Sequence, residues 1–174
     1  MRKFRMCAAA AGLCILMAAV PMTSYGFSLF RSNSETEAAE ETAYEFKKGD
    51  TVISMGAEAA PVLTALGTAK DTFEQDSCAY QGKSIVYLYD GFEMSTSKVD
   101  GKECIESVYV TGNQVSTPEG IKIGSGIEDV KKAYGTDYEE SFGVYRYTAG
   151  NTELSFYTTN NVVDAIEYLV IVAQ

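Results

Sequence analysis

The sequence predicts an α+β protein made of two tandem repeats, each a short helix followed by an antiparallel meander, with the helices on one face of a shared sheet. The first observation is that the segment 55–68 reappears at 123–136, with Gly, Val, Ala, Gly and Thr coinciding. The second is that each copy is followed, in the same order, by Tyr-x-Tyr, Glu-apolar-Ser and Ile-Glu. The same order of helix and strand signals in two segments of the chain indicates a duplicated structural unit.

Each repeat contains one predicted helix. In the second copy, Ser125 and Glu128 are spaced as a capping box, apolar residues recur at helical spacing, and Gly135 supplies the stop. In the first copy, Pro61 fits the first helical turn, where its missing N–H costs little, and Gly67 ends the helix.

Alternating apolar patterns after each helix predict the strands, and turn compositions such as Asp90-Gly91 separate them. A shorter strand is predicted before each helix. The predicted strands are 51–55, 84–89, 92–97 and 103–111 in the first copy, and 120–123, 144–147, 152–157 and 162–172 in the second.

The N-terminus has the pattern of a signal peptide over residues 1–26. A basic start precedes an apolar run over 7–20, and small residues at 24 and 26 fit a cleavage site after Gly26. The run is shorter than the roughly 20 residues that span a bilayer, so a retained membrane anchor is the alternative interpretation.

The remainder divides into an acidic, disordered tether at 27–46 and a single domain at 47–174, with repeats at 47–117 and 118–174. The full chain has a net charge of −10. Removing residues 1–26 leaves 11 basic and 24 acidic residues, a net charge of −13. This charge argues against nucleic acid as a partner, and membrane binding is expected only if the N-terminal segment is retained.

The chain has no histidine, which removes the commonest general base and metal ligand. We therefore expect no catalytic residue, no metal and no cofactor. Two close carboxylate pairs, Glu103 with Glu106 and Glu139 with Glu140, leave a carboxylate-dependent hydrolase as a third, disfavoured hypothesis.

The cysteines that remain after processing are Cys78 and Cys104, and they are a possible disulfide in an oxidising compartment. Two separate buried thiols are the alternative. The sequence does not decide between them.

The tyrosine usage is skewed, with twelve tyrosines and no tryptophan. Tyr87 and Tyr89 are predicted to share one sheet face, and so are Tyr145 and Tyr147. Such tyrosines either pack within a half-buried sheet or form a recognition surface, and both interpretations stay open.

The segment 123–130 with Tyr134-Gly135, and more faintly Met55-Gly56 with Val62 and Leu66-Gly67, resembles the β-lactamase-inhibitor-like domains and the related small barrel-assembly lipoprotein domain. Residues 77–82 and 87–93 are similar to secreted proteins of anaerobic Gram-positive bacteria. The resemblance implies one curved antiparallel sheet that grips a protein partner, with Asp90 as the analogue of an inhibitory loop acid.

The leading functional hypothesis is a secreted, non-enzymatic module that binds another extracellular or envelope protein through a sheet face and its hairpin tips. The alternative is an envelope-associated structural protein held by an uncleaved N-terminal segment. The candidate partner-binding residues are Tyr87, Tyr89, Asp90, Phe92, Tyr145 and Tyr147.

Cleavage of the signal peptide is tested by intact-mass and N-terminal peptide mass spectrometry of the exported protein. We expect a mature N-terminus at Phe27, because cleavage after Gly26 fits the small-residue rule. An N-terminus that retains the apolar run at 7–20 would instead support the anchored form.

Overall fold

The computed structural model describes residues 42–77 and 79–172, all of which belong to one compact unit. Eight strands form an antiparallel sheet in the order β3-β4-β5-β6-β10-β9-β8-β7, and two more form a separate hairpin, β1-β2. The bounds are β1 (Glu45–Lys48), β2 (Thr51–Ser54), α1 (Ala59–Leu66), β3 (Asp71–Asp76), β4 (Lys83–Tyr89), β5 (Phe92–Val99), β6 (Lys102–Val110), α2 (Ile127–Tyr134), β7 (Glu139–Ser141), β8 (Val144–Ala149), β9 (Thr152–Thr159) and β10 (Val162–Val170).

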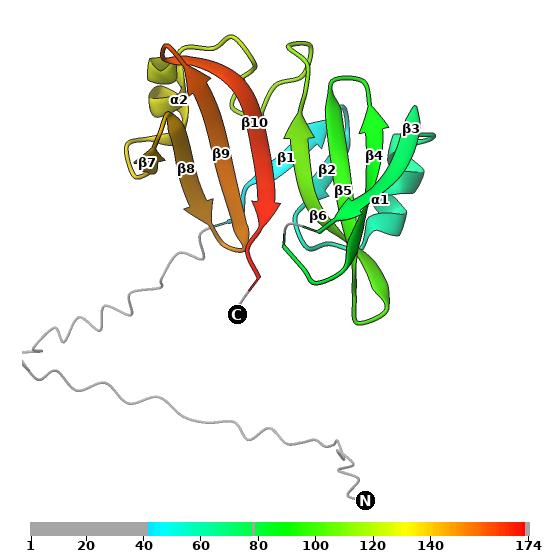
Figure 1. Cartoon of the computed structure of the whole chain (residues 1–174). Coiled ribbons are helices and arrows are strands. Elements are labelled where there is room, and N and C mark those ends of the chain that lie inside the picture. The colour runs from blue at the N-terminus through cyan, green and yellow to red at the C-terminus, as the bar shows by residue number, and fades with distance from the viewer. Residues whose placement is uncertain (1–41, 78, 173–174) are drawn as a thin grey trace, which may run out of the picture. The chain divides into compact units, whose positions relative to one another are not determined.

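The two helices and the β1–β2 hairpin all lie behind the eight-stranded sheet in Figure 1. The hydrophobic core fills the space between these elements and the sheet. Phe46 of β1 is fully buried there, with its ring centroid 5.1 Å from that of Phe92 and 5.7 Å from that of Tyr168. We call this side of the sheet the covered face and the opposite side the uncovered face.

The sheet is continuous because β10 pairs with β6 in its middle. Ile166 faces Val110, and Tyr168 faces Val108, and all four side chains are buried in the core. Apolar side chains on directly opposed residues of antiparallel strands stabilise such a junction. The strands β3–β6 and β7–β10 therefore form one sheet rather than two.

The predicted fold class is wrong. The described residues are mostly β, with 51% in strands and 12% in two eight-residue helices, and a single large antiparallel sheet dominates. This is not an α+β protein of two helix-plus-meander repeats. The β1–β2 hairpin precedes α1, whereas residues 120–123, the expected strand before α2, form none, because only Ile121 is buried and its neighbours are exposed.

Three strands were absent from the prediction. β3 and β7 are exposed along their whole lengths, so they lack the apolar alternation that reveals a strand. β1 lies at the end of the segment predicted as a disordered tether, yet Phe46 within it is fully buried. Each of the other predicted strands overlaps an observed strand.

The start of α2 also differs from the predicted capping box. The N-cap is Gly126, whose backbone N–H donates to the Asp129 carboxylate over 3.3 Å. Ser125 Oγ instead accepts a hydrogen bond from the Lys122 N–H at 3.1 Å, which stabilises the turn before the helix. The predicted stop at Gly135 is confirmed, with a positive φ of 86°.

The predicted signal peptide, most of the predicted tether, and Cys78 lie outside the described residues. Within the described ranges, neither helix has the length and apolar character needed to cross a membrane.

The phenylalanines Phe92 and Phe142 provide a matched test of the core. Phe92 is 1% exposed, so Phe92→Ala is expected to lower the free energy of unfolding by about 3–5 kcal/mol. Phe142 is fully exposed at the β7–β8 turn with a φ of 52°, so Phe142→Asn is expected to raise that free energy by about 1 kcal/mol. Urea unfolding followed by circular dichroism measures both, and equal effects of the two substitutions would contradict this assignment.

Candidate functional site

The predicted tyrosine pairs lie on the covered face of the sheet, as expected for residues that alternate along a strand. Phe92 and Tyr147 are each 1% exposed and belong to the core. They are therefore unavailable to a partner, and the interpretation of these two residues as partner contacts is corrected. Tyr147 O–H donates to the Gly135 carbonyl at 3.1 Å, which ties the end of α2 to the sheet.

The half-buried tyrosines of the predicted site also make contacts within the fold. Tyr87 O–H donates to Glu103 at 2.8 Å, and burial followed by that hydrogen bond raises the pKa of Tyr87 to about 12. Tyr89 stacks on Phe92, with ring centroids 5.0 Å apart. Tyr145 packs edge-on against Tyr138 at 5.1 Å. These contacts favour a packing role for the tyrosine pairs.

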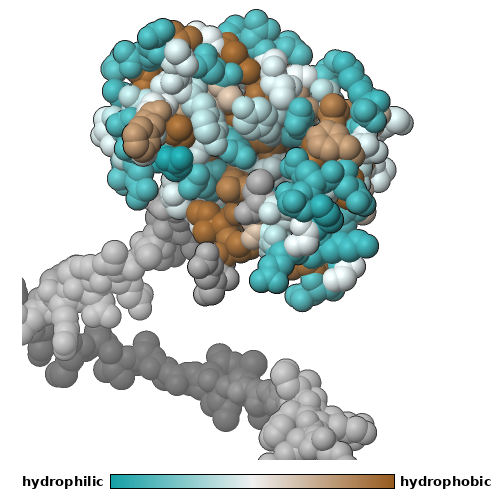
Figure 2. Space-filling model, in the orientation of Figure 1, coloured by the Kyte–Doolittle hydropathy of each residue, from teal (hydrophilic) through white to brown (hydrophobic). Residues whose placement is uncertain are grey.

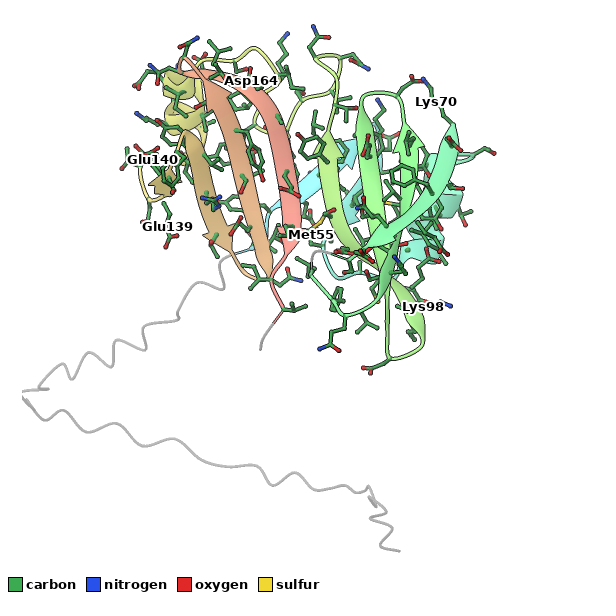
Figure 3. All side chains as sticks on the ribbon, viewed as in Figure 1. Met55, Lys70, Lys98, Glu139, Glu140 and Asp164 are labelled. Carbon is green, nitrogen blue, oxygen red and sulfur yellow. The ribbon has the colours of Figure 1, made fainter. Side chains whose placement is uncertain are left out.

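Asp90 occupies the exposed tip of the β4–β5 hairpin, as predicted. It forms an ion pair with Lys70, which Figure 3 labels beside β3, and this hydrogen bond lowers the pKa of the Asp90 carboxyl. Ion pairs between exposed side chains add little stability. Asp90 is the one predicted contact residue whose side chain is largely exposed.

The two carboxylate pairs do not face one another across a cleft. Glu103 accepts hydrogen bonds on the covered face, whereas Glu106 is held by serines of the uncovered face. Glu139 and Glu140 are exposed neighbours on β7, whose side chains alternate between the two faces (Figure 3). Within the described parts of the chain, no group of three or more acidic or cysteine side chains is arranged to hold a metal ion.

Glu106 is a buried carboxylate that sequence reasoning did not single out as a structural element. It is 2% exposed and accepts hydrogen bonds from Ser77 Oγ at 2.8 Å, the Ala79 N–H at 2.9 Å and Ser97 Oγ at 2.5 Å, and from Ser84 Oγ. Burial alone would raise the pKa of Glu106, but these hydrogen bonds together lower it. The carboxylate therefore fastens Ser77 and Ala79 to the sheet.

Cys104 lies half-buried in β6. Its candidate partner Cys78 is outside the described residues, so the disulfide stays a prediction.

The uncovered face carries a row of side chains in register across all eight strands. Figure 1 shows β3 crossing in front of β4 and β5 on this side but no helix in front of it, and Figure 2 shows a largely hydrophilic surface with scattered apolar side chains. In strand order, the row is Asp71, Leu88, Glu93, Tyr109, Glu167, Ser155, Arg146 and Glu139. We call it the Tyr109 row.

Tyr109 stands between two carboxylates at the centre of this row. It is 38% exposed, and it is directly opposite Glu93 on one side and Glu167 on the other. Partial burial, then Glu167 and Glu93, raise the pKa of Tyr109, so the hydroxyl stays protonated. An aromatic ring between carboxylates suits a cationic side chain, which gains from both the ring face and the charges.

The carboxylates of the Tyr109 row outnumber its cation by four to one. The guanidinium of Arg146 already forms an ion pair, because its Nε lies 3.5 Å from the carboxylate of Glu153 on the next strand. Tyr157 O–H donates to Glu167 at 2.6 Å and fixes that carboxylate beside Tyr109. The uncovered face is therefore an ordered acidic surface.

The sequence contained a signal for this row. Glu93 and Tyr109 alternate with the apolar residues that made β5 and β6 recognisable as strands. The sequence-based prediction relied on the tyrosine pairs instead, and these lie on the opposite, covered face.

No protein-family model matches the chain, and no curated protein matches it. Among solved structures, it is similar to a cysteine-rich secretory protein from Staphylococcus aureus, with a TM-score of 0.48 and 18% sequence identity. The alignment covers 67% of this chain and 44% of that protein, so this chain spans less than half of its length. The resemblance to β-lactamase-inhibitor-like domains stays a prediction.

The role of Glu106 is tested by the pH dependence of stability. Because its pKa is lowered on folding, ionised Glu106 stabilises the protein above its ordinary pKa near 4.5, and this stabilisation is lost as pH falls through the folded-state pKa. Glu106→Gln is expected to lower the free energy of unfolding by about 1–3 kcal/mol at pH 7. The difference from the wild type should shrink in acid.

Urea unfolding between pH 3 and 7 measures this effect. Glu74→Gln, which alters an exposed carboxyl of the neighbouring strand β3, is the control. A difference between wild type and Glu106→Gln that does not vary with pH would contradict the assigned role.

Proposed function

We propose that this chain is an exported, non-enzymatic protein-binding module, and that the Tyr109 row is its contact surface for a basic protein. The single observation that carries the proposal is the acidic row with an accessible tyrosine at its centre, on the one sheet face that no helix covers. The proposal keeps the predicted function and moves its contact residues to the other face.

The arrangement of the core supports this choice of surface. The covered face is filled by the helices and the β1–β2 hairpin, so its tyrosines contribute to stability. On the uncovered face the strand register places Tyr109 between Glu93 and Glu167, and Tyr109 is 38% exposed. Rigid tyrosines give contact area at a low cost in conformational entropy.

Charge supports the chemistry of the partner. The chain has a net charge of −10, and the Tyr109 row concentrates carboxylates around Tyr109. Complementary charge accelerates association and disfavours acidic competitors. Lysine or arginine side chains of a basic protein fit the space beside Tyr109, where Glu93 and Glu167 flank the ring.

A hairpin tip adds an apolar contact of the kind the sequence hypothesis expected. Phe142 is fully exposed at the β7–β8 turn and has a φ of 52°, a conformation that favours Asn or Gly. It contributes no buried surface to the fold. Phe142 and Asp90 lie at turns at the same end of the strands, near opposite edges of the sheet.

The proposal is tested by zero-length carbodiimide cross-linking of the exported protein in its native medium, followed by peptide mass spectrometry. This reagent joins carboxylates to lysine amines without a spacer, so each product identifies the carboxylate in contact. We expect cross-links from Glu93 or Glu167 to lysines of one basic protein. Tyr109→Ala is expected to reduce their yield about tenfold or more.

The matched controls are Asp137→Asn and Glu128→Gln, which remove exposed carboxylates that do not belong to the row. Neither should change the yield. Products formed only through Asp137 or Glu128, or products that persist in Tyr109→Ala, would refute the uncovered face as the binding surface.

A further inference from the structure

Tyr168 presents a buried hydroxyl without a hydrogen-bond partner. The residue is 1% exposed, and its hydroxyl makes no hydrogen bond within the described part of the chain. The Tyr134 hydroxyl influences the pKa of Tyr168, but Tyr134 donates its own hydrogen bond to Glu119. Leaving a hydroxyl buried and unpaired costs about 1–3 kcal/mol, which phenylalanine would avoid.

The ring of Tyr168 is on the covered face and lines a cleft of about 480 Å³. One wall of this cleft is formed by the chain from Thr42 to Lys47, and the other by Pro118 and Glu119. The cleft is separate from the Tyr109 row, which is on the opposite face of the sheet.

The wall that contains β1 is also a free strand edge. Among the described strands, β1 has β2 as its only neighbour. The hairpin turns over two residues, so Lys48 and Thr51 form the closing hydrogen-bonded pair. Because pairing alternates along an antiparallel ladder, the backbone groups of Glu45 and Lys47 point away from β2. These are the two β1 residues that line the cleft.

We propose that this cleft binds an extended, basic polypeptide segment, which adds as a third strand to β1. The segment would exchange hydrogen bonds with the backbone of Glu45 and Lys47, and one of its carbonyls would accept a hydrogen bond from Tyr168. Strand addition of this kind derives its affinity from main-chain hydrogen bonds. It also converts a two-stranded hairpin into a more stable three-stranded sheet.

The charges of the cleft favour a basic segment. Glu45 and Glu119 contribute two carboxylates against the single ammonium of Lys47. Both carboxylates are oriented by hydrogen bonds, from Ser54 Oγ to Glu45 at 2.7 Å and from Tyr134 O–H to Glu119. The segment therefore meets fixed negative charges on both walls of the cleft.

The experiment is an NMR titration of the exported protein with a capped hexapeptide of alternating lysine and valine. We expect shifts and slowed hydrogen exchange at the amides of Glu45 and Lys47. A peptide that is N-methylated at alternate positions cannot pair with a strand edge and should not bind. Tyr168→Phe should fold normally, because it loses only an unpaired hydroxyl, and should bind about 5- to 10-fold more weakly.

Substitutions at Lys47 separate the backbone from the side chain. Lys47→Pro removes an outward N–H, which an edge strand tolerates, and should abolish binding, whereas Lys47→Ala keeps the N–H and should retain it. If Lys47→Pro does not fold, the methylated peptide and Tyr168→Phe decide the question.

Three results would overturn the proposal. They are equal binding of the methylated peptide, shifts confined to the Tyr109 row, and an affinity unchanged in Tyr168→Phe, which would mean that the hydroxyl contacts only water.

Discussion

The fold depends on the burial of Phe46 against the middle of the sheet. Its ring contacts Phe92 on β5 and Tyr168 on β10, so one side chain of β1 packs against both halves of the eight-stranded sheet. Beside it, β6 and β10 pair directly. A two-stranded hairpin is marginal by itself, and burial of its apolar side chains on a larger sheet stabilises both. The remaining covered face is closed by α1 and α2.

This one-sided core determines where the surface chemistry can occur. Side chains on the covered face, such as Tyr147, have their positions fixed by packing, even when they are aromatic and carry a polar tip. Side chains on the uncovered face are positioned by strand register and by side-chain hydrogen bonds such as that from Tyr157 to Glu167. Tyr109 lies between Glu93 and Glu167 and is still 38% exposed. An antiparallel sheet with one packed and one solvated face thereby supplies a rigid surface.

The sequence predicted most strands because alternation and turn residues are local signals. It missed β3 and β7 because their side chains are all exposed, so neither strand shows an alternation of buried and exposed residues. Capping and stop residues located two short helices, and each observed helix has eight residues. It did not show that Phe92 and Tyr147 are buried, since an aromatic residue in a strand does not reveal which face is packed.

At each of the two proposed contact surfaces, one residue lowers the stability of the fold, and no contact within the described chain offsets that loss. Tyr168 keeps a hydroxyl that finds no partner in the described chain, and Phe142 combines full exposure with a left-handed conformation that a bulky residue disfavours. Sequences that fold well are consistent at every level, and functional positions are where that consistency is broken. Glu106 is the instructive contrast, because its buried charge is surrounded by donors and its cost is compensated inside the fold. The unpaired hydroxyl of Tyr168 and the exposed ring of Phe142 have no such compensation within the described chain.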